Sequence, residues 1–220
     1  MCIQPRTNQA DYVRFVTINS RGEGGCSSNV GRRGGLQEIT INGCPLGSIQ
    51  HEILHAAGMF HEQSRSDRDN FVRINRDNII PDRINNFERE DNTISSCPYD
   101  YGSIMHYPAS AFAIDPDDPN RNTTIVALRP LPVGVIMGQR NGLSNCDIQG
   151  INTLYQNASG CLTPNPAMTR TFTPNPLGIL CPNLKTRGDA EFAGGPLIQC
   201  NVRIQVSPGG EYLEAIVYFK

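Results

Sequence analysis

The sequence predicts an α+β fold from strand patterns early in the chain, two helical patterns and a hairpin pattern near the C-terminal end. Apolar residues alternate at 11–18 and 36–41, which is typical of half-buried strands. Helical patterns begin near Ser48 and at Ser144, and serine is a favoured N-cap residue. Two further alternating segments flank the SPGG sequence at 207–210 and predict a hairpin.

Apolar faces accompany these patterns. In the first strand, Val13, Phe15 and Thr17 share one side. The second strand ends at the turn sequence Asn42-Gly43. In the first helix, a stripe at four-residue spacing lies nearly opposite the side that carries two histidines; it consists of Ile49, Ile53 and Ala57.

Two further helices are expected. Pro81 opens a short helix over 81–89, where the missing N–H of proline costs little. The helix from Ser144 has Asp147 three residues later, which approximates a capping box. Its apolar face is expected to contain Ile148, Ile151 and Tyr155.

Composition excludes several classes of partner. The chain has 220 residues and a net charge of −2, enough for one domain and part of a second. The isoelectric point near 6.1 and the absence of a basic patch argue against a nucleic-acid partner. No apolar run approaches the roughly 18 residues of a membrane span.

Cysteine usage indicates the compartment. The eight cysteines are widely spread and form no CxxC pair. This pattern fits disulfides in an oxidising environment better than a thiolate metal site, so we expect an extracellular or secreted protein. The first residues contain no signal peptide.

The sequence HEILHAAGMFHE, from His51 to Glu62, predicts a metal site. His51 and His55 are four residues apart and therefore lie on one face of a helix. Gly58 can adopt a left-handed conformation, so the chain can turn there and bring His61 back as a third ligand. Three neutral imidazoles form a zinc site that keeps a position open for water.

Glu52 supplies the expected base of this site. It follows the first ligand directly and can accept a proton from a zinc-bound water, whose pKa falls towards about 7. These are the mechanics of a metallopeptidase. The pentapeptide HExxH alone could be a chance match on a surface helix, but here it continues as HExxHxxGxxH, and Ser103–Tyr107 supplies a Met-turn sequence downstream.

With Glu62 after the third histidine and Tyr107 closing SIMHY, residues 2–161 resemble the astacin family of metzincin zinc metalloendopeptidases. The resemblance implies a metzincin-type domain with a twisted sheet, an active-site helix and a C-terminal helix. It also implies that Tyr107 is a further zinc ligand that can swing away to stabilise the oxyanion. Met105 would form a hydrophobic floor beneath the histidines, and Glu62 would contact the buried N-terminus of the mature enzyme.

The same resemblance suggests disulfides and a substrate contact. Astacins pair cysteines at the positions of Cys2 with Cys161 and of Cys26 with Cys44, and the short separation of the latter two independently favours a local bridge. Cys97 with Cys146, outside the minimal family pattern, and Cys181 with Cys200 are two further candidate pairs. Arg140 lies in a GQR sequence that astacins place near the pocket just beyond the scissile bond, where it would favour an acidic residue; a plain surface arginine is the alternative.

We expect three regions: residues 1–162 as a peptidase domain that lacks the family's N-terminal segment, residues 163–176 as a Pro-rich linker, and residues 177–220 as an incomplete β-rich accessory module of unknown ligand. The leading hypothesis is a secreted zinc endopeptidase that hydrolyses protein or peptide substrates. The alternative is a catalytically incompetent fragment or binding module that retains the zinc site.

Overall fold

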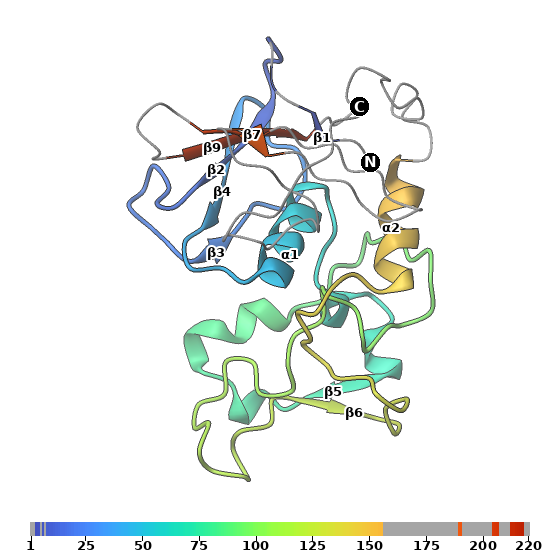
Figure 1. The fold of residues 1–220 in the computed structure, drawn as a ribbon. Helices are drawn as coiled ribbons and strands as arrows, with labels where there is room; N and C mark the ends of the chain where they lie inside the picture. The colour runs from blue at the N-terminus through green and yellow to red at the C-terminus, as the bar shows by residue number, and fades with distance from the viewer. Residues whose placement is uncertain are drawn as a thin grey trace. The chain divides into compact units, whose positions relative to one another are not determined.

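The computed structural model describes residues 3–4, 6, 8–155, 189–190, 204–206 and 212–217. The chain divides into two compact units, one of Met1–Met59 with Ile151–Lys220 and one of Phe60–Gly150. Helices and sheets are both present, which confirms the α+β class (Figure 1). Within the described ranges, we find no helix with the length and apolar character that a membrane span requires.

One sheet organises the first unit (Figure 1). In the described residues it has seven strands, and β2 and β4 lie parallel at its centre while every other pair is antiparallel. The order is β3 (Cys26–Ser27), β4 (Leu36–Ile41), β2 (Tyr12–Val16), β9 (Tyr212–Val217), β8 (Ile204–Val206) and β7 (Asp189–Ala190), with β1 (Ile3–Gln4) paired to β9.

The strand predictions hold at the core of this sheet. Strand β4 has the predicted bounds, and Val13 and Phe15 on β2 are buried, as is Ile39 on β4. Thr17 does not share their face, because β2 ends at Val16 and Thr17 is exposed. Arg14 is the register partner of Glu38, so oppositely charged residues stand opposite each other on the two parallel strands.

Helix α1 (Leu46–Ala56) packs against β3 and β4. The predicted N-cap near Ser48 is wrong: Pro45 holds that position, and its carbonyl accepts the N–H groups of Ser48 and Ile49. Proline suits a helix start because its φ is fixed near the helical value and its missing N–H would be unpaired there. Cys44, directly before it, is held by the disulfide to Cys26, which confirms that predicted pair.

The buried stripe of α1 is also shifted from the prediction. Ile49 and Ala57 are buried, but Ile53 is only half-buried. Leu54, at 2% exposure, takes the place of Ile53 in the core.

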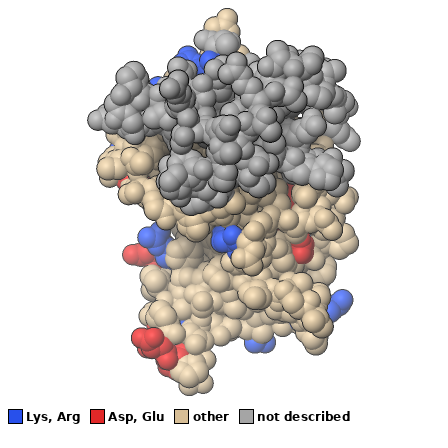
Figure 2. All heavy atoms as spheres, viewed as in Figure 1, with Lys and Arg blue, Asp and Glu red and all other residues tan. Residues whose placement is uncertain are grey.

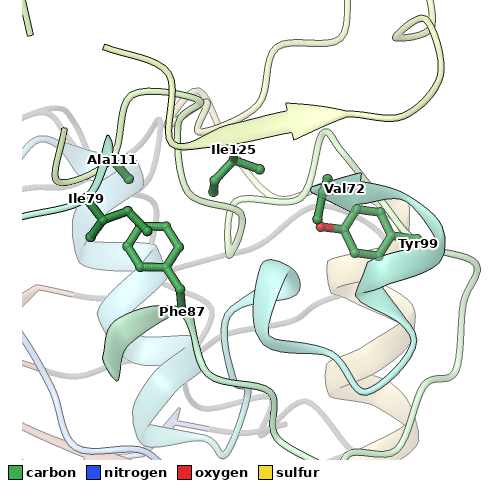
Figure 3. Close-up of a cluster of buried hydrophobic side chains, with 6 residues drawn as sticks. All are labelled: Val72, Ile79, Phe87, Tyr99, Ala111 and Ile125. Carbon is green, nitrogen blue, oxygen red and sulfur yellow. The ribbon is translucent and has the colours of Figure 1, made fainter. Parts of the chain in front are cut away.

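The second unit consists mainly of loops and short 3₁₀ helices around a compact apolar cluster. Its elements are η1 (Glu62–Ser64), η2 (Arg68–Asn70), β5 (Val72–Ile74), η3 (Arg76–Asn78), η4 (Pro81–Phe87) and β6 (Ile125–Ala127), with β5 and β6 paired antiparallel. Figure 3 shows the cluster, in which Ile79 and Phe87 lie next to each other. The helix expected at 81–89 starts at Pro81 as predicted, but it is a 3₁₀ helix and ends at Phe87.

Helix α2 (Asn145–Tyr155) begins with the predicted capping box. The Asp147 N–H donates to Ser144 Oγ at 3.0 Å, and the Ser144 N–H donates to the Asp147 carboxylate at 2.8 Å. The disulfide between Cys97 and Cys146 ties the start of α2 to the loop before the SIMHY sequence. This candidate pair is confirmed.

The predicted C-terminal hairpin is present as the antiparallel pair β8–β9, and β9 also pairs with β2. The expected linker at 163–176 and the candidate pairs Cys2–Cys161 and Cys181–Cys200 lie outside the described residues. On the face drawn in Figure 2, basic and acidic side chains of the described residues are scattered, apart from a small acidic group at one lower corner.

Candidate active site

Helix α1 places two histidines and a carboxylate in a buried position. His51 and His55 lie one helical turn apart, with ring centroids separated by 4.5 Å and ring planes at 86°. Their exposed fractions are 5% each, and that of Glu52 is 7%. The sequence-predicted pair of ligands is therefore together on one helix face.

The second histidine is oriented by its own helix end. His55 Nδ1 lies 2.8 Å from the carbonyl oxygen of Met59. Because a carbonyl only accepts hydrogen bonds, Nδ1 carries the proton and Nε2 keeps its lone pair. Ligating histidines in metal sites are usually oriented by such a bond from the other ring nitrogen.

Gly58 makes the turn that follows α1. Its φ is +105°, and its N–H donates to the carbonyl of His55 at 2.8 Å. An added Cβ would meet no atom within 4 Å, so the requirement for glycine is conformational rather than steric. This is the predicted role of Gly58.

Beyond the turn, His61 completes a group that could hold a metal ion. The candidate ligand atoms of His51, His55 and His61 all lie within 4.8 Å of one another. Three imidazoles suit zinc, and a site with three protein ligands keeps one position for water or substrate. The residues present therefore fit a catalytic zinc ion.

The Met-turn, Ser103–Tyr107, is anchored by the carboxylate of Asp147. Ser103 Oγ donates to it at 2.5 Å and the Ile104 N–H at 2.9 Å. The Met105 N–H donates to Ser103 Oγ at 2.9 Å, and the Met105 carbonyl accepts the Glu62 N–H at 3.1 Å. Met105 itself is fully buried. The turn is thus bound both to α2 and to the residue after His61.

Tyr107 lies beside the third histidine. Its ring centroid is 4.3 Å from that of His61, with a tilt of 53° between the planes. On other sides its ring meets those of Phe87 and Phe112 edge-on, at 5.8 and 5.6 Å. Its N–H donates to Gln63 Oε1 at 3.0 Å. Tyr107 is therefore adjacent to a metal-ligand candidate, as the family resemblance implies.

Glu62 is a buried carboxyl with mixed partners. Burial raises its pKa to about 7, although the Asp100 N–H at 2.8 Å and the Arg65 guanidinium at 2.9 Å both act to lower it. Desolvation of the charged form outweighs these contacts. Arg65 also pairs with Asp67 at 2.8 Å, so its charge is shared between two carboxylates.

His106 is a core residue, and both of its ring nitrogens have partners within the protein. It is fully buried, and its ring nitrogens lie 2.8 Å from the Tyr99 hydroxyl and 2.6 Å from the Tyr107 carbonyl. Burial lowers the pKa of His106 to about 4 and raises the pKa of Tyr99, because desolvation disfavours the imidazolium and the phenolate alike.

Arg140 is half-buried and reaches the Met-turn. Its Nη1 donates to the His106 carbonyl at 3.2 Å and to the Gln139 carbonyl at 2.9 Å. Gln139 is itself tied to Gly102 by a bond of 2.8 Å. The guanidinium is thus held by the backbone of the segment that carries Tyr107.

Sequence reasoning missed three supports of the site: Gln63, Tyr99 and the Met-turn role of Asp147. Gln63 and Asp147 each lie 44 residues from the Met-turn partner they bind, and Tyr99 lies 7 residues from His106. Only Asp147 carried a local signal, its capping-box position. Gln63 and Tyr99 had none beyond their place next to the motif residues.

A helix with HExxH, followed by a glycine turn and a third histidine, is the signature of the metzincin class of zinc peptidases. The family model for the astacin peptidases matches residues 1–156. High choriolytic enzyme 1 from Oryzias latipes is 47% identical over 154 residues, which cover 68% of this chain and 53% of that protein. The chain belongs to the astacin family of peptidases.

Two further comparisons agree with this assignment. Zinc metalloproteinase nas-36 from Haemonchus contortus is 36% identical over 213 residues, which cover 90% of this chain and 33% of that protein. The solved structure of high choriolytic enzyme 1, a hatching enzyme zinc-protease from medaka, superposes with a TM-score of 0.59 at 47% identity and covers 69% of this chain and 72% of that chain. The chain spans about half the length of the choriolytic enzymes it matches.

Proposed function

We propose that this protein is a secreted zinc-dependent endopeptidase. The single observation that carries the proposal is the cluster of His51, His55 and His61, whose ligand atoms lie within 4.8 Å of one another, in a chain of the astacin family. The three histidines, with Tyr107 as a further ligand, would hold the zinc. Zinc bound there would lower the pKa of a coordinated water towards about 7 and polarise the scissile carbonyl.

Glu52 acts as the general base. On α1, Glu52 stands one residue after His51 and three before His55. Residues three apart are neighbours on a helix surface, so the Glu52 carboxylate lies beside the second ligand without being a ligand itself. It accepts the proton of the attacking water and returns it to the leaving amine. The Glu52 carboxylate lies in the buried part of the helix, at 7% exposure.

Tyr107 stabilises the oxyanion. Its phenol donates a hydrogen bond to the carbonyl oxygen as negative charge develops there, an interaction stronger in the transition state than in the ground state. Its place beside His61, 4.3 Å between ring centroids, supports this role. Gly58 shapes the turn that leads to His61, and Met105, whose carbonyl accepts the Glu62 N–H at 3.1 Å, forms the hydrophobic floor beneath the histidines.

The test combines zinc content with hydrolysis of a denatured protein substrate, for the wild-type chain and for Glu52→Gln. We expect about one zinc per chain in both, as three ligands imply. Chelator-sensitive cleavage should occur only in the wild type. A matched control is Glu38→Gln, which removes a carboxylate of the sheet that lies outside the site.

Two outcomes would contradict the proposal. Undiminished cleavage by Glu52→Gln would exclude Glu52 as the base. Zinc bound without any cleavage by the wild type would favour the alternative, a binding module that keeps the metal site.

We further propose that Arg140 favours an acidic residue just after the scissile bond. Its half-buried guanidinium, bound to the His106 carbonyl, remains a strong partner for a carboxylate. Peptides with Asp or Lys at that position test this: the Asp peptide should be cleaved faster, and Arg140→Gln should remove the difference. Equal rates for the wild type would contradict it.

Secretion is supported by the disulfides Cys26–Cys44 and Cys97–Cys146, since such bonds persist in oxidising compartments. The division into a peptidase domain at 1–162, a linker at 163–176 and an accessory module at 177–220 is part of the same proposal.

A further inference from the structure

Buried side chains hold the peptide groups on both sides of Tyr107. Its N–H donates to Gln63 Oε1 at 3.0 Å, and its carbonyl oxygen lies 2.6 Å from His106 Nδ1. Gln63 and His106 are both fully buried. Tyr107 belongs to no helix or strand, so these side chains, rather than regular backbone pairing, satisfy the hydrogen-bonding groups of its backbone.

The bonds around His106 have one consistent direction. The Tyr107 carbonyl can only accept, so His106 Nδ1 carries a proton. In a neutral ring Nε2 is then an acceptor, and it takes the O–H of Tyr99 at 2.8 Å. The Tyr99 hydroxyl therefore donates to His106 Nε2, and His106 Nδ1–H donates to the Tyr107 carbonyl.

Tyr99 is itself fixed on several sides. Its ring stacks on Phe71, with centroids 4.7 Å apart and planes within 8°. The Arg65 guanidinium lies 5.5 Å from the ring centroid, and Tyr101 meets the ring edge-on at 5.2 Å. The phenolic oxygen of Tyr99 is thus directed at His106 by packing that does not involve the oxygen.

Gln63 connects this arrangement to the third histidine. It stands two residues after His61, and the intervening Glu62 donates its N–H to the Met105 carbonyl at 3.1 Å. Two successive bonds therefore join the segment after His61 to the end of the Met-turn. A large shift of the Tyr107 backbone relative to the residues that follow His61 would break one or both of these bonds.

We propose that Gln63, His106 and Tyr99 are positioning residues, a buried frame that fixes Tyr107 relative to His61. The proposal rests on the function proposed above for Tyr107. The frame transfers no proton; it fixes the backbone from which the phenol reaches the substrate. Catalytic groups must be held within about 0.5 Å of their working geometry, which a loop residue without such support does not achieve.

Tyr99→Phe is the decisive variant, because it removes one oxygen and keeps the contacts with Phe71 and Arg65. We expect kcat to fall by between about 10-fold and about 100-fold, with KM changed less than about twofold and zinc content unchanged. Tyr101→Phe is the matched control: it loses a hydroxyl bond of 2.8 Å to the Phe71 carbonyl in the same cluster but does not reach Tyr107. Its kcat should match that of the wild type.

A double-mutant cycle separates positioning from general loosening. If Tyr99 acts through Tyr107, Tyr99→Phe in a Tyr107→Phe background should lower kcat by less than about twofold. An equal loss in both backgrounds would overturn the frame, because the effect would then not pass through the Tyr107 phenol.

Amide hydrogen exchange gives a readout that does not depend on activity. In the chelated wild type the Tyr107 amide should be protected; in Tyr99→Phe it should exchange about 10-fold faster, and in Tyr101→Phe it should not change. With only four histidines in the chain, ¹⁵N-labelled histidine spectra should also show His106 as the neutral Nδ1–H tautomer. Unchanged exchange in Tyr99→Phe would overturn the frame, whereas absence of any hydrolysis by the wild type would overturn the proposed function and leave the exchange test decisive for the frame.

Discussion

Replacement of Asp147 by Ala should destabilise the second unit strongly, because this one carboxylate serves three donors. It accepts Ser103 Oγ at 2.5 Å, the Ile104 N–H at 2.9 Å and the Ser144 N–H at 2.8 Å. Asp147 is 2% exposed, Ser103 2% and Ile104 0%, so water cannot replace the lost acceptor without rearrangement. The first two donors belong to the Met-turn and the third to the start of α2.

The magnitude follows from the donors left behind. A buried donor without an acceptor costs about 1–3 kcal/mol, and the half-buried Ser144 less. We therefore expect Asp147→Ala to lose about 3–5 kcal/mol of unfolding free energy, a large share of the roughly 5–15 kcal/mol of a typical domain. Asp147→Asn keeps one acceptor oxygen and should lose about half as much.

Urea unfolding of the chelated chain, followed by circular dichroism, measures this loss. Asp117→Ala is the control, since that carboxylate is exposed and surface changes stay within about 0.5 kcal/mol. A loss below about 1 kcal/mol for Asp147→Ala, at an unchanged m-value, would refute the reasoning. It would mean that the Met-turn finds other acceptors at little cost.

Two further predictions concern the segment after α1. Gly58→Ala should cost about 1–2 kcal/mol, because alanine is strained at a φ of +105° although space is available; unchanged urea stability would contradict this. In the chelated chain, Glu62 has a folded pKa of about 7 against 4.5 when unfolded, so the folded state holds the extra proton and stability falls as pH rises through that window. Glu62→Gln removes this loss, so the free energy of unfolding of the variant should rise relative to that of the wild type by about 3 kcal/mol between pH 4.5 and pH 8. A constant difference in unfolding free energy across that range would show that Glu62 does not titrate as a buried carboxyl.

The sequence was most informative where the determinants are local. The bounds of β4, the capping box of α2 and the convergence of the three histidines each depend on residues within a dozen positions. All three features were predicted correctly. The start of α1 was misplaced because serine preference at an N-cap is weaker than the constraint that Pro45 imposes. Ile53 was placed in the core by spacing alone, but burial depends on which neighbours cover the helix.

The supports of Tyr107 and of the Met-turn could not be predicted, because they are made by tertiary contacts without a periodic signal. A glutamine after a charged motif is expected to be exposed at the surface. Gln63 is instead fully buried and accepts the N–H of a residue 44 positions away. The same separation joins Ser103 to Asp147. The role of such buried polar residues can be recognised only when the fold shows which groups they bind.

These two sets of contacts imply different sensitivities to substitution. The histidines are placed by one helix and one turn, so a variant far along the chain should leave zinc binding intact as long as α1 and Gly58 persist. Tyr107 instead depends on Gln63, His106 and Asp147, which come from three separate segments. Substitutions around the Met-turn should therefore impair turnover well before they impair metal binding, and a chain that binds zinc but hydrolyses slowly should first be examined at the Met-turn rather than at the histidines.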